Sequence, residues 1–317
     1  MEEFIPGVKI KILGIGTAGC KILDRMIAEG LEGVDFVAIN TDASSLAESL
    51  ANKKINIGHN LTKGLGAGGN IEIGRKAAEE SEHEIKEMLQ DTNMVFVTCG
   101  MSGGTGSGAT PVIANIAKKM GILTIAIVTT PFSFELHDRP GRRFNVEEGL
   151  KKIKEAVDAF IVIPNDKIFK VIDKKTTFKQ AFAIIDNILF LSVQGISDLI
   201  INPGNIDIDF ADVKNIMIDS GSRSIGIGYG TGDNKTINAT RNAIENFGLY
   251  SNLSKVKNII LSVTGGDDTT IEEAREAATI LEEIIDPNTN FLWGMPWYEN
   301  MKDEVKVIII ATGLEAE

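Results

Sequence analysis

The chain has 317 residues, 43% of them hydrophobic and 24% charged, which is ordinary for a globular protein and sufficient for two domains. Its formal net charge of −12 argues against binding to nucleic acid or to an anionic membrane surface, because phosphate groups are bound mainly by Lys and Arg. Its two cysteines, Cys20 and Cys99, are too few for a disulfide framework, so we expect a cytoplasmic protein.

The first residues, MEEFIPGVKIKI, are acidic and lead quickly into a strand pattern, which predicts no secretory signal peptide. No apolar run approaches the ~20 residues that span a bilayer, so we expect no insertion into a membrane.

Strand and helix patterns alternate along the first half of the chain. Short apolar segments rich in β-branched residues predict strands at residues 8–16, 34–42, 93–100, 123–131 and 159–166. Helical patterns fall between them at residues 18–30, 71–90, 109–121 and 146–160. Because the strands are almost continuously apolar, we predict a Rossmann-like parallel sheet with helices on both faces.

The second half of the chain has a different pattern. Residues 176–201 predict a long helix that is apolar around most of its circumference and is therefore buried. Strand patterns at 222–230, 256–266, 290–296 and 304–313 alternate with helical patterns at 236–248 and 269–285. The α/β chain is thus predicted to consist of a nucleotide-binding domain (1–175), a central helix (176–201) and a smaller α+β domain with a mixed sheet (202–317).

Two glycine-rich segments, GIGTAGC at residues 14–20 and GGTGSG at 103–108, each follow a predicted strand and open a helix. Glycine allows backbone N–H groups to approach a phosphate closely, and a helix N-terminus adds partial positive charge. A third segment, GLGAGGN at 64–70, also precedes a helix and is placed to cap a terminal phosphate. Glycines at such turns can also serve packing alone, but three such loops favour a ligand with several phosphates.

The first loop on its own has the spacing Gly14-x-Gly16-x-x-Gly19, with Asp42 at the end of the next strand, which matches a dinucleotide-binding fingerprint. A nicotinamide-dependent oxidoreductase is therefore one alternative, although it leaves the second loop unexplained. A Walker-type loop is excluded because Cys20, Lys21 and Ile22 follow Gly19.

The segment GGTGSGATP resembles the signature of the tubulin/FtsZ family of GTPases. Further segments resemble the FtsZ branch in order and spacing: VDFVAINTDASSL, GLGAGGN, PFSFE, VIPND, VQGISDLI, DFADVK and LSVTGG. The resemblance implies a protein that binds GTP or GDP with Mg²⁺, hydrolyses GTP and polymerises head-to-tail into filaments at the division site of the cell. It also implies partner proteins of the division machinery, bound through a C-terminal tail that these residues do not include.

The resemblance also implies which residues bind the nucleotide, with those of the first and second loops holding its phosphates. The nucleotide-binding residues are Gly16, Thr17, Ala18, Gly19, Cys20, Asn40, Thr41, Gly66, Ala67, Gly68, Gly69, Gly103, Gly104, Thr105 and Gly106. The family usually has a run of glycines followed by Asn in the first loop, where this chain has Thr17, Ala18 and Cys20. Backbone donors survive such changes, and a small packed residue is the alternative role for Cys20.

On the base side, Asp186 matches the family's aspartate in the central helix. A carboxylate accepts hydrogen bonds from the adjacent N1–H and exocyclic N–H of guanine, a pair that adenine does not offer. Phe182, four residues earlier, matches the family's base-stacking aromatic residue, with core packing as the alternative. Glu135 matches a ribose-contacting glutamate, and either Arg139 or Arg142 matches the arginine that follows it.

The segment NIDIDFADV places Asp207, Asp209 and Asp212 together, and Asp207 stands where the family usually has Asn. The resemblance implies that these carboxylates act on the nucleotide of the next subunit in a filament, where they orient the attacking water. Bound Mg²⁺ would offset the extra charge, and no metal site formed by protein side chains alone is predicted. The alternatives are a solvated acidic turn, with Asp209 capping the next helix, and a filament protein that hydrolyses GTP weakly.

Overall fold

The computed structural model describes residues 7–137, 141–170, 172–173, 175–201, 209–218, 222–246, 253–299 and 301–314. The chain divides into two compact units, Met1–Phe190 and Leu191–Glu317, and the division falls within helix α8 (Phe178–Ile201). The predicted boundaries at residues 175 and 201 stay a prediction.

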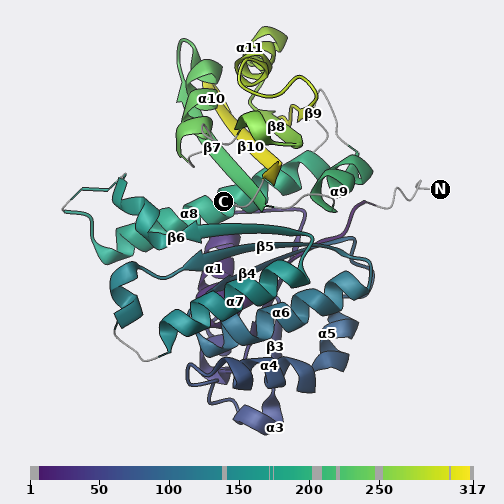
Figure 1. The fold of residues 1–317 in the computed structure, drawn as a ribbon, viewed down its shortest axis with the longest axis vertical. Coiled ribbons are helices and arrows are strands. Elements are labelled where there is room, and N and C mark those ends of the chain that lie inside the picture. The colour runs from purple at the N-terminus through teal and green to yellow at the C-terminus, as the bar shows by residue number, and fades with distance from the viewer. Residues whose placement is uncertain are drawn as a thin grey trace. The chain divides into compact units, whose positions relative to one another are not determined.

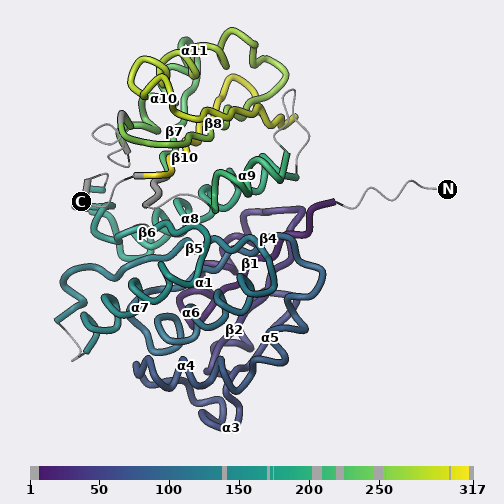
Figure 2. Tube along the Cα trace, turned by 45° about the vertical axis from the view of Figure 1, so that its right-hand side comes forward, coloured from purple at the N-terminus to yellow at the C-terminus, as the bar shows by residue number. Residues whose placement is uncertain are grey.

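The first unit is built on a six-stranded sheet in which every neighbouring pair of strands is parallel (Figure 1). Its strands are β1 (Ile10–Ile15), β2 (Asp35–Asn40), β3 (Lys53–Asn56), β4 (Met94–Gly100), β5 (Leu123–Thr130) and β6 (Ala159–Pro164). The strand order is β3-β2-β1-β4-β5-β6, so the chain builds outward from β1 in one direction and from β4 in the other. Strands β1 and β4 are distant in sequence but lie side by side (Figure 2). In such sheets a crevice for ligands opens where the order reverses, at the carboxyl ends of these two strands.

The helices of the first unit occupy both faces of this sheet. They are α1 (Gly16–Ala28), α2 (Ala43–Ala47), α3 (His59–Thr62), α4 (Ile71–Glu80), α5 (Glu82–Met88), α6 (Gly104–Lys119) and α7 (Arg142–Ala156), with 3₁₀ turns η1 (Ser133–His137) and η2 (Asn165–Lys170). The predicted helix at 71–90 is wrong in one respect, because α4 and α5 are separated at Ser81. The hydroxyl of Ser81 accepts a hydrogen bond from Gly58 N at 3.0 Å.

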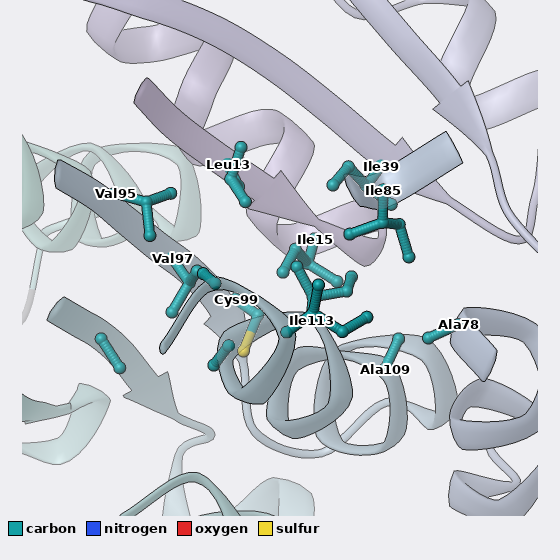
Figure 3. Packing of buried hydrophobic residues seen from close by; sticks show 14 of the residues in the cluster. Leu13, Ile15, Ile39, Ala78, Ile85, Val95, Val97, Cys99, Ala109 and Ile113 are labelled. Atoms are coloured by element: carbon teal, nitrogen blue, oxygen red, sulfur yellow. The ribbon is translucent and has the colours of Figure 1, made fainter. Parts of the chain in front are cut away.

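Helices α4 to α7 cover one face of the sheet and α1 packs against β1, β2 and β4 on the other. Figure 3 shows Val95, Val97 and Cys99 of β4 pointing into the core beneath α6. Every residue of β4 except Gly100 is buried, which confirms that the apolar strands are covered on both sides. The predicted parallel α/β fold is therefore confirmed.

Helices α4 and α6 come into close contact at two glycine residues, Gly74 and Gly108. A Cβ built on Gly74 would lie 2.1 Å from the carbonyl oxygen of Gly104, and one on Gly108 would lie 2.1 Å from that of Ile71. No side chain fits in either gap, so the backbones themselves are in contact. This contact fixes the beginning of α6 against α4.

The second unit contains a four-stranded mixed sheet in the order β7-β10-β8-β9. Its elements are α9 (Phe210–Ile218), β7 (Ser222–Thr231), α10 (Lys235–Asn246), η3 (Leu253–Lys255), β8 (Asn258–Thr264), α11 (Ile271–Glu282), β9 (Asn290–Gly294) and β10 (Glu304–Leu314). Strand β10 is antiparallel to β7 and β8, whereas β8 and β9 are parallel. Helices α10 and α11 pack on this sheet over a separate apolar core. The predicted mixed α+β architecture is confirmed.

Helix α8 is long and apolar enough to cross a membrane by length and composition, contrary to the expectation that no segment would be. This is weak evidence for a span, because 61% of its most apolar window is buried within the structure, as in a core helix. Its last turns carry Asp198, which accepts a hydrogen bond from Tyr298 Oη at 2.5 Å and lies 3.5 Å from Lys306 Nζ. Both charged side chains are buried, and their pairing compensates part of the desolvation of each.

We predict that Gly74→Ala destabilises the first unit by about 1–3 kcal/mol, because the added methyl group overlaps the Gly104 carbonyl. In an open helix the same change would stabilise by roughly 1 kcal/mol, so the sign is diagnostic. Urea unfolding followed by circular dichroism measures the difference. The control is Lys76→Ala on the exposed face of α4, which should change stability by less than about 0.5 kcal/mol. A more stable Gly74→Ala protein would contradict the close contact.

Candidate functional site

A cavity of about 750 Å³ opens at the carboxyl ends of β1, β2 and β4, beside the beginnings of α1 and α6. This is the edge of the sheet at which the strand order reverses. The volume lies in the range typical of ligand pockets. All residues that line the cavity belong to the first unit.

The cavity brings together most of the residues predicted to bind a nucleotide. Those lining it are Gly16, Thr17, Ala18, Asn40, Thr41, Gly66, Ala67, Gly68, Gly69, Gly103, Gly104, Thr105, Gly106, Phe182 and Asp186. They come from all three glycine-rich loops and from α8. The cavity is also lined by four residues that were not among the predicted ligands: Lys21, Ser102, Thr129 and Asn165.

The first loop combines packing glycines with one that shapes the turn. Gly16 has φ +72°, which L side chains rarely adopt, and it begins α1. Gly19 is packed instead, since its Cβ would lie 2.5 Å from the Thr98 carbonyl oxygen. Cys20 is buried with its Sγ 3.5 Å from Gly14 O, and burial raises the pKa of its thiol to about 12. Gly19 and Cys20 do not line the cavity, and their contact with a ligand stays a prediction.

The second loop presents the beginning of α6 to the cavity. Gly103 is the N-cap residue and provides no side-chain cap, so the first N–H groups of the helix lack that partner. Thr105 is joined to Thr41 by a hydrogen bond of 2.7 Å between their hydroxyl oxygens, which ties this loop to the end of β2. An uncapped helix N-terminus lined by glycine is suited to an anion such as phosphate.

Hydrogen bonds hold the third loop in place at both of its ends. Asn70 caps α4 by accepting hydrogen bonds from Glu72 N and Ile73 N. At the other end, Ala43 N donates to Gly64 O at 2.9 Å, and Asp42 forms a β-bridge with Leu65. Asp42 also caps α2 by accepting from Ser45 N at 2.8 Å. Asp42 therefore has a structural role, and it also lines the cavity.

The far side of the cavity carries a carboxylate and an amide. Burial raises the pKa of Asp186 to about 6, and the nearby cations Arg25 and Lys21 limit the rise. The side chain of Asn165 is buried, and its Oδ1 has no hydrogen-bond partner among the residues that the structure describes. An unpaired buried amide oxygen costs folding free energy. The segment VIPND was the signal that pointed to Asn165, but it did not identify which residue matters.

Aromatic side chains surround this end of the cavity. Phe182 is 42% exposed and makes an edge-on contact with Phe132, with ring centroids 5.7 Å apart. Phe132 also contacts Phe134 and Phe169, both of which are more than half exposed. Phe182 is therefore not simply a core residue, and one face of its ring is free to stack on a ligand.

Glu135 and Arg142 form an ion pair instead of lining the cavity. Arg142 Nη1 lies 2.9 Å from Glu135 Oε2 and also donates to the Glu135 carbonyl oxygen at 3.2 Å. Arg139 lies outside the described residues. The predicted contacts of Glu135 and of either arginine with a nucleotide stay predictions.

The predicted catalytic carboxylates belong to the second unit. Asp209 and Asp212 are exposed at the beginning of α9, and the Asp209 carbonyl oxygen accepts from Asp212 N and Val213 N. Asp209 thus occupies the N-cap position that was its structural alternative. Asp207 lies outside the described residues. Within the described part of the chain, no group of three or more His, Cys, Asp or Glu side chains is arranged to hold a metal ion.

The fold and the cavity together define a nucleotide-binding protein of the doubly wound α/β class. Comparisons identify the family. The tubulin/FtsZ family GTPase domain matches residues 9–173, and the FtsZ family C-terminal domain matches residues 221–315. The chain therefore belongs to the tubulin/FtsZ family, and the guanine-nucleotide binding and GTPase activity of that family apply to it.

Solved structures agree with this assignment. An FtsZ dimer from M. jannaschii is 42% identical with a TM-score of 0.88, and the match covers 96% of this chain and 88% of that chain. CetZ2 from Haloferax volcanii, solved as a GTPγS-bound protofilament, is 20% identical with a TM-score of 0.81 and coverages of 98% and 94%. CetZ from Methanosaeta thermophila is 19% identical with a TM-score of 0.78 and coverages of 98% and 87%. The two CetZ structures show a shared fold.

We predict that affinity for guanosine diphosphate falls as the pH decreases through about 6, because the ionised Asp186 carboxylate is the form that accepts two guanine N–H groups. Well below that pH the loss approaches about tenfold per pH unit. Calorimetric titration from pH 5 to pH 8 measures it.

Asp186→Asn is the reference for that experiment, since protonation of the nucleotide phosphates affects both proteins equally. It should bind more weakly at pH 7 and lack the additional pH dependence. Its fold should not suffer at pH 7, because burial already disfavours the charge on Asp186. Parallel pH profiles for the two proteins would exclude Asp186 from base recognition.

Proposed function

We propose that this protein binds GTP in the cavity of the first unit, polymerises head-to-tail and hydrolyses the nucleotide between adjacent subunits, as a cytoplasmic cell-division protein acting at the division site. The observation that carries the proposal is that the cavity and the predicted catalytic carboxylates belong to different units of the chain. Every residue that lines the cavity belongs to the first unit, whereas the carboxylates of Asp209 and Asp212 are exposed on the second.

The phosphates of GTP would be bound mainly by backbone. The beginnings of α1 and α6 direct N–H groups toward the cavity, and the third loop closes it from a further side. The hydroxyls of Thr41 and Thr105 are oxygen ligands of the kind that Mg²⁺ accepts together with phosphate oxygens and water. Bound Mg²⁺ would neutralise phosphate charge in a site that offers few cationic side chains.

Side chains would select the base. The Asp186 carboxylate would accept hydrogen bonds from N1–H and the exocyclic amino group of guanine, and Asn165 also lines the cavity. The exposed ring of Phe182 offers a stacking surface. Adenine would leave the Asp186 carboxylate without donors, which is the basis of the selectivity.

Hydrolysis would require a second copy of the chain. The carboxylates at the beginning of α9 would orient a water molecule against the terminal phosphate held by the neighbouring subunit, which is largely a task of positioning. A contact of this head-to-tail kind propagates as a filament when rotation does not close it. Exposed Phe134, Phe169 and Phe178 near the base side form an apolar patch that such a neighbour would cover, and the homologous CetZ2 forms a protofilament.

We predict that GTP turnover per molecule rises with protein concentration and that Asp212→Ala abolishes it while leaving GTP affinity within about twofold. A matched control is Asp233→Ala, which removes another exposed carboxylate of the second unit. Phosphate release measured across a concentration series, with sedimentation in GTP and in GDP, provides the data. Turnover that is strictly first order in protein, without any assembly, would refute the proposal.

We also predict that the Asp186→Asn variant binds xanthosine triphosphate more tightly than guanosine triphosphate, which reverses the expected preference of the wild-type protein. Xanthine has a carbonyl oxygen where guanine has its exocyclic amino group, and the Asn amide can donate to that oxygen. Selectivity built on paired donors and acceptors changes by large factors when one partner is reversed. Competition between the two nucleotides in a fluorescence assay tests this. An unchanged preference for guanine would show that Asp186 does not contact the base.

A further inference from the structure

Asn145 lies in the first turn of α7 and is 8% exposed. Its side-chain nitrogen donates to the carbonyl oxygen of Gly69 at 2.8 Å and to that of Ser102 at 3.3 Å. An amide nitrogen carries two hydrogens, so a single uncharged side chain serves both carbonyls. No sequence motif contains this residue.

The two carbonyls belong to different glycine-rich loops. Gly69 lies in the third loop and Ser102 immediately precedes Gly103 at the beginning of α6, and both residues line the cavity. Asn145 is not among the lining residues. It therefore acts on the cavity only through the two loops that it joins.

The helix that carries Asn145 is itself held in place. A Cβ on Gly149, one turn further along α7, would lie 3.0 Å from Met101 Sδ and 3.0 Å from Ser107 Cβ. By contrast, Gly69 has φ +81° and no atom within 4 Å of a Cβ built on it. Ala67 and Asn70 of the same loop pack closely on Gly104, so Asn145 adds to this contact a hydrogen-bonded restraint at Gly69.

We propose that Asn145 is a positioning residue that holds the third loop against the beginning of α6, so that both close on the terminal phosphate and favour GTP over GDP. This inference rests on the proposed function. If the third loop contacts only the terminal phosphate, loss of the restraint weakens binding of the triphosphate and leaves binding of GDP almost unchanged.

The test compares Asn145→Leu with the wild-type protein. Leu has the same branching as Asn and no donor, so the variant removes both hydrogen bonds without opening a cavity. Affinities for guanosine 5′-O-(3-thiotriphosphate) and for GDP are measured at protein concentrations too low for assembly, which light scattering verifies. The ratio of the two affinities should fall about fivefold to tenfold, the effect of losing one or two hydrogen bonds of ordinary strength.

Lys151→Ala, on the exposed side of the same helix, is the matched control and should leave the ratio unchanged. Asn145→Ala should reproduce the effect of Asn145→Leu. A purely structural role would lower both affinities together and preserve the ratio, and that result would overturn the inference. If wild-type protein binds neither nucleotide, the proposed function fails instead.

Hydrogen exchange on the wild-type protein gives a second measurement that does not depend on any variant folding. With the thiotriphosphate, exchange at residues 64–70 and at the beginning of α7 should slow together relative to the GDP-bound protein. Equal exchange in the two complexes, or slowing in the loop alone, would also overturn the inference.

Discussion

Backbone-to-backbone contact at glycine is the constraint on which the cavity depends. Gly74 of α4 and Gly104 of α6 leave no room for a side chain between them, and their contact sets where α6 begins. The N–H groups at that point then face the cavity, because the preceding strand β4 ends beside β1 at the reversal of strand order. The glycines of the signature therefore have two physical roles. Some admit a neighbouring backbone, and others leave space for a ligand.

In the proposed site, backbone N–H groups would bind the phosphates and side chains would recognise the base. In the proposed function, phosphate recognition through N–H groups would tolerate the unusual residues of the first loop, because Thr17 and Ala18 retain their backbone donors. Base recognition as proposed would depend on particular side chains, among them Asp186, whose pKa is raised to about 6 by burial. A carboxylate kept partly desolvated in this way binds paired N–H donors more strongly than a fully solvated one would.

Much of the fold followed from local pattern. Apolar β-branched segments predicted the strands, and near-continuous burial predicted the parallel sheet, because strands covered on both faces have no polar alternation. The break at Ser81 was missed because the helical pattern continues through it, while the bond from Gly58 comes from a distant part of the chain. Helix α8 was predicted with nearly its observed bounds and as buried, but the expectation that no apolar segment is long enough to cross a membrane was wrong.

The sequence by itself determined the class of protein and the loops of its site, because glycine spacing and strand pattern are local properties that a resemblance can detect. Only the tertiary structure decided which residues face the cavity. Cys20 does not line it, Asp42 lines it while capping a helix, and Asn165 lines it as well. Asn145 joins two loops that are more than thirty residues apart in the chain. Such roles depend on the direction of a side chain relative to distant backbone, and no local pattern encodes that direction.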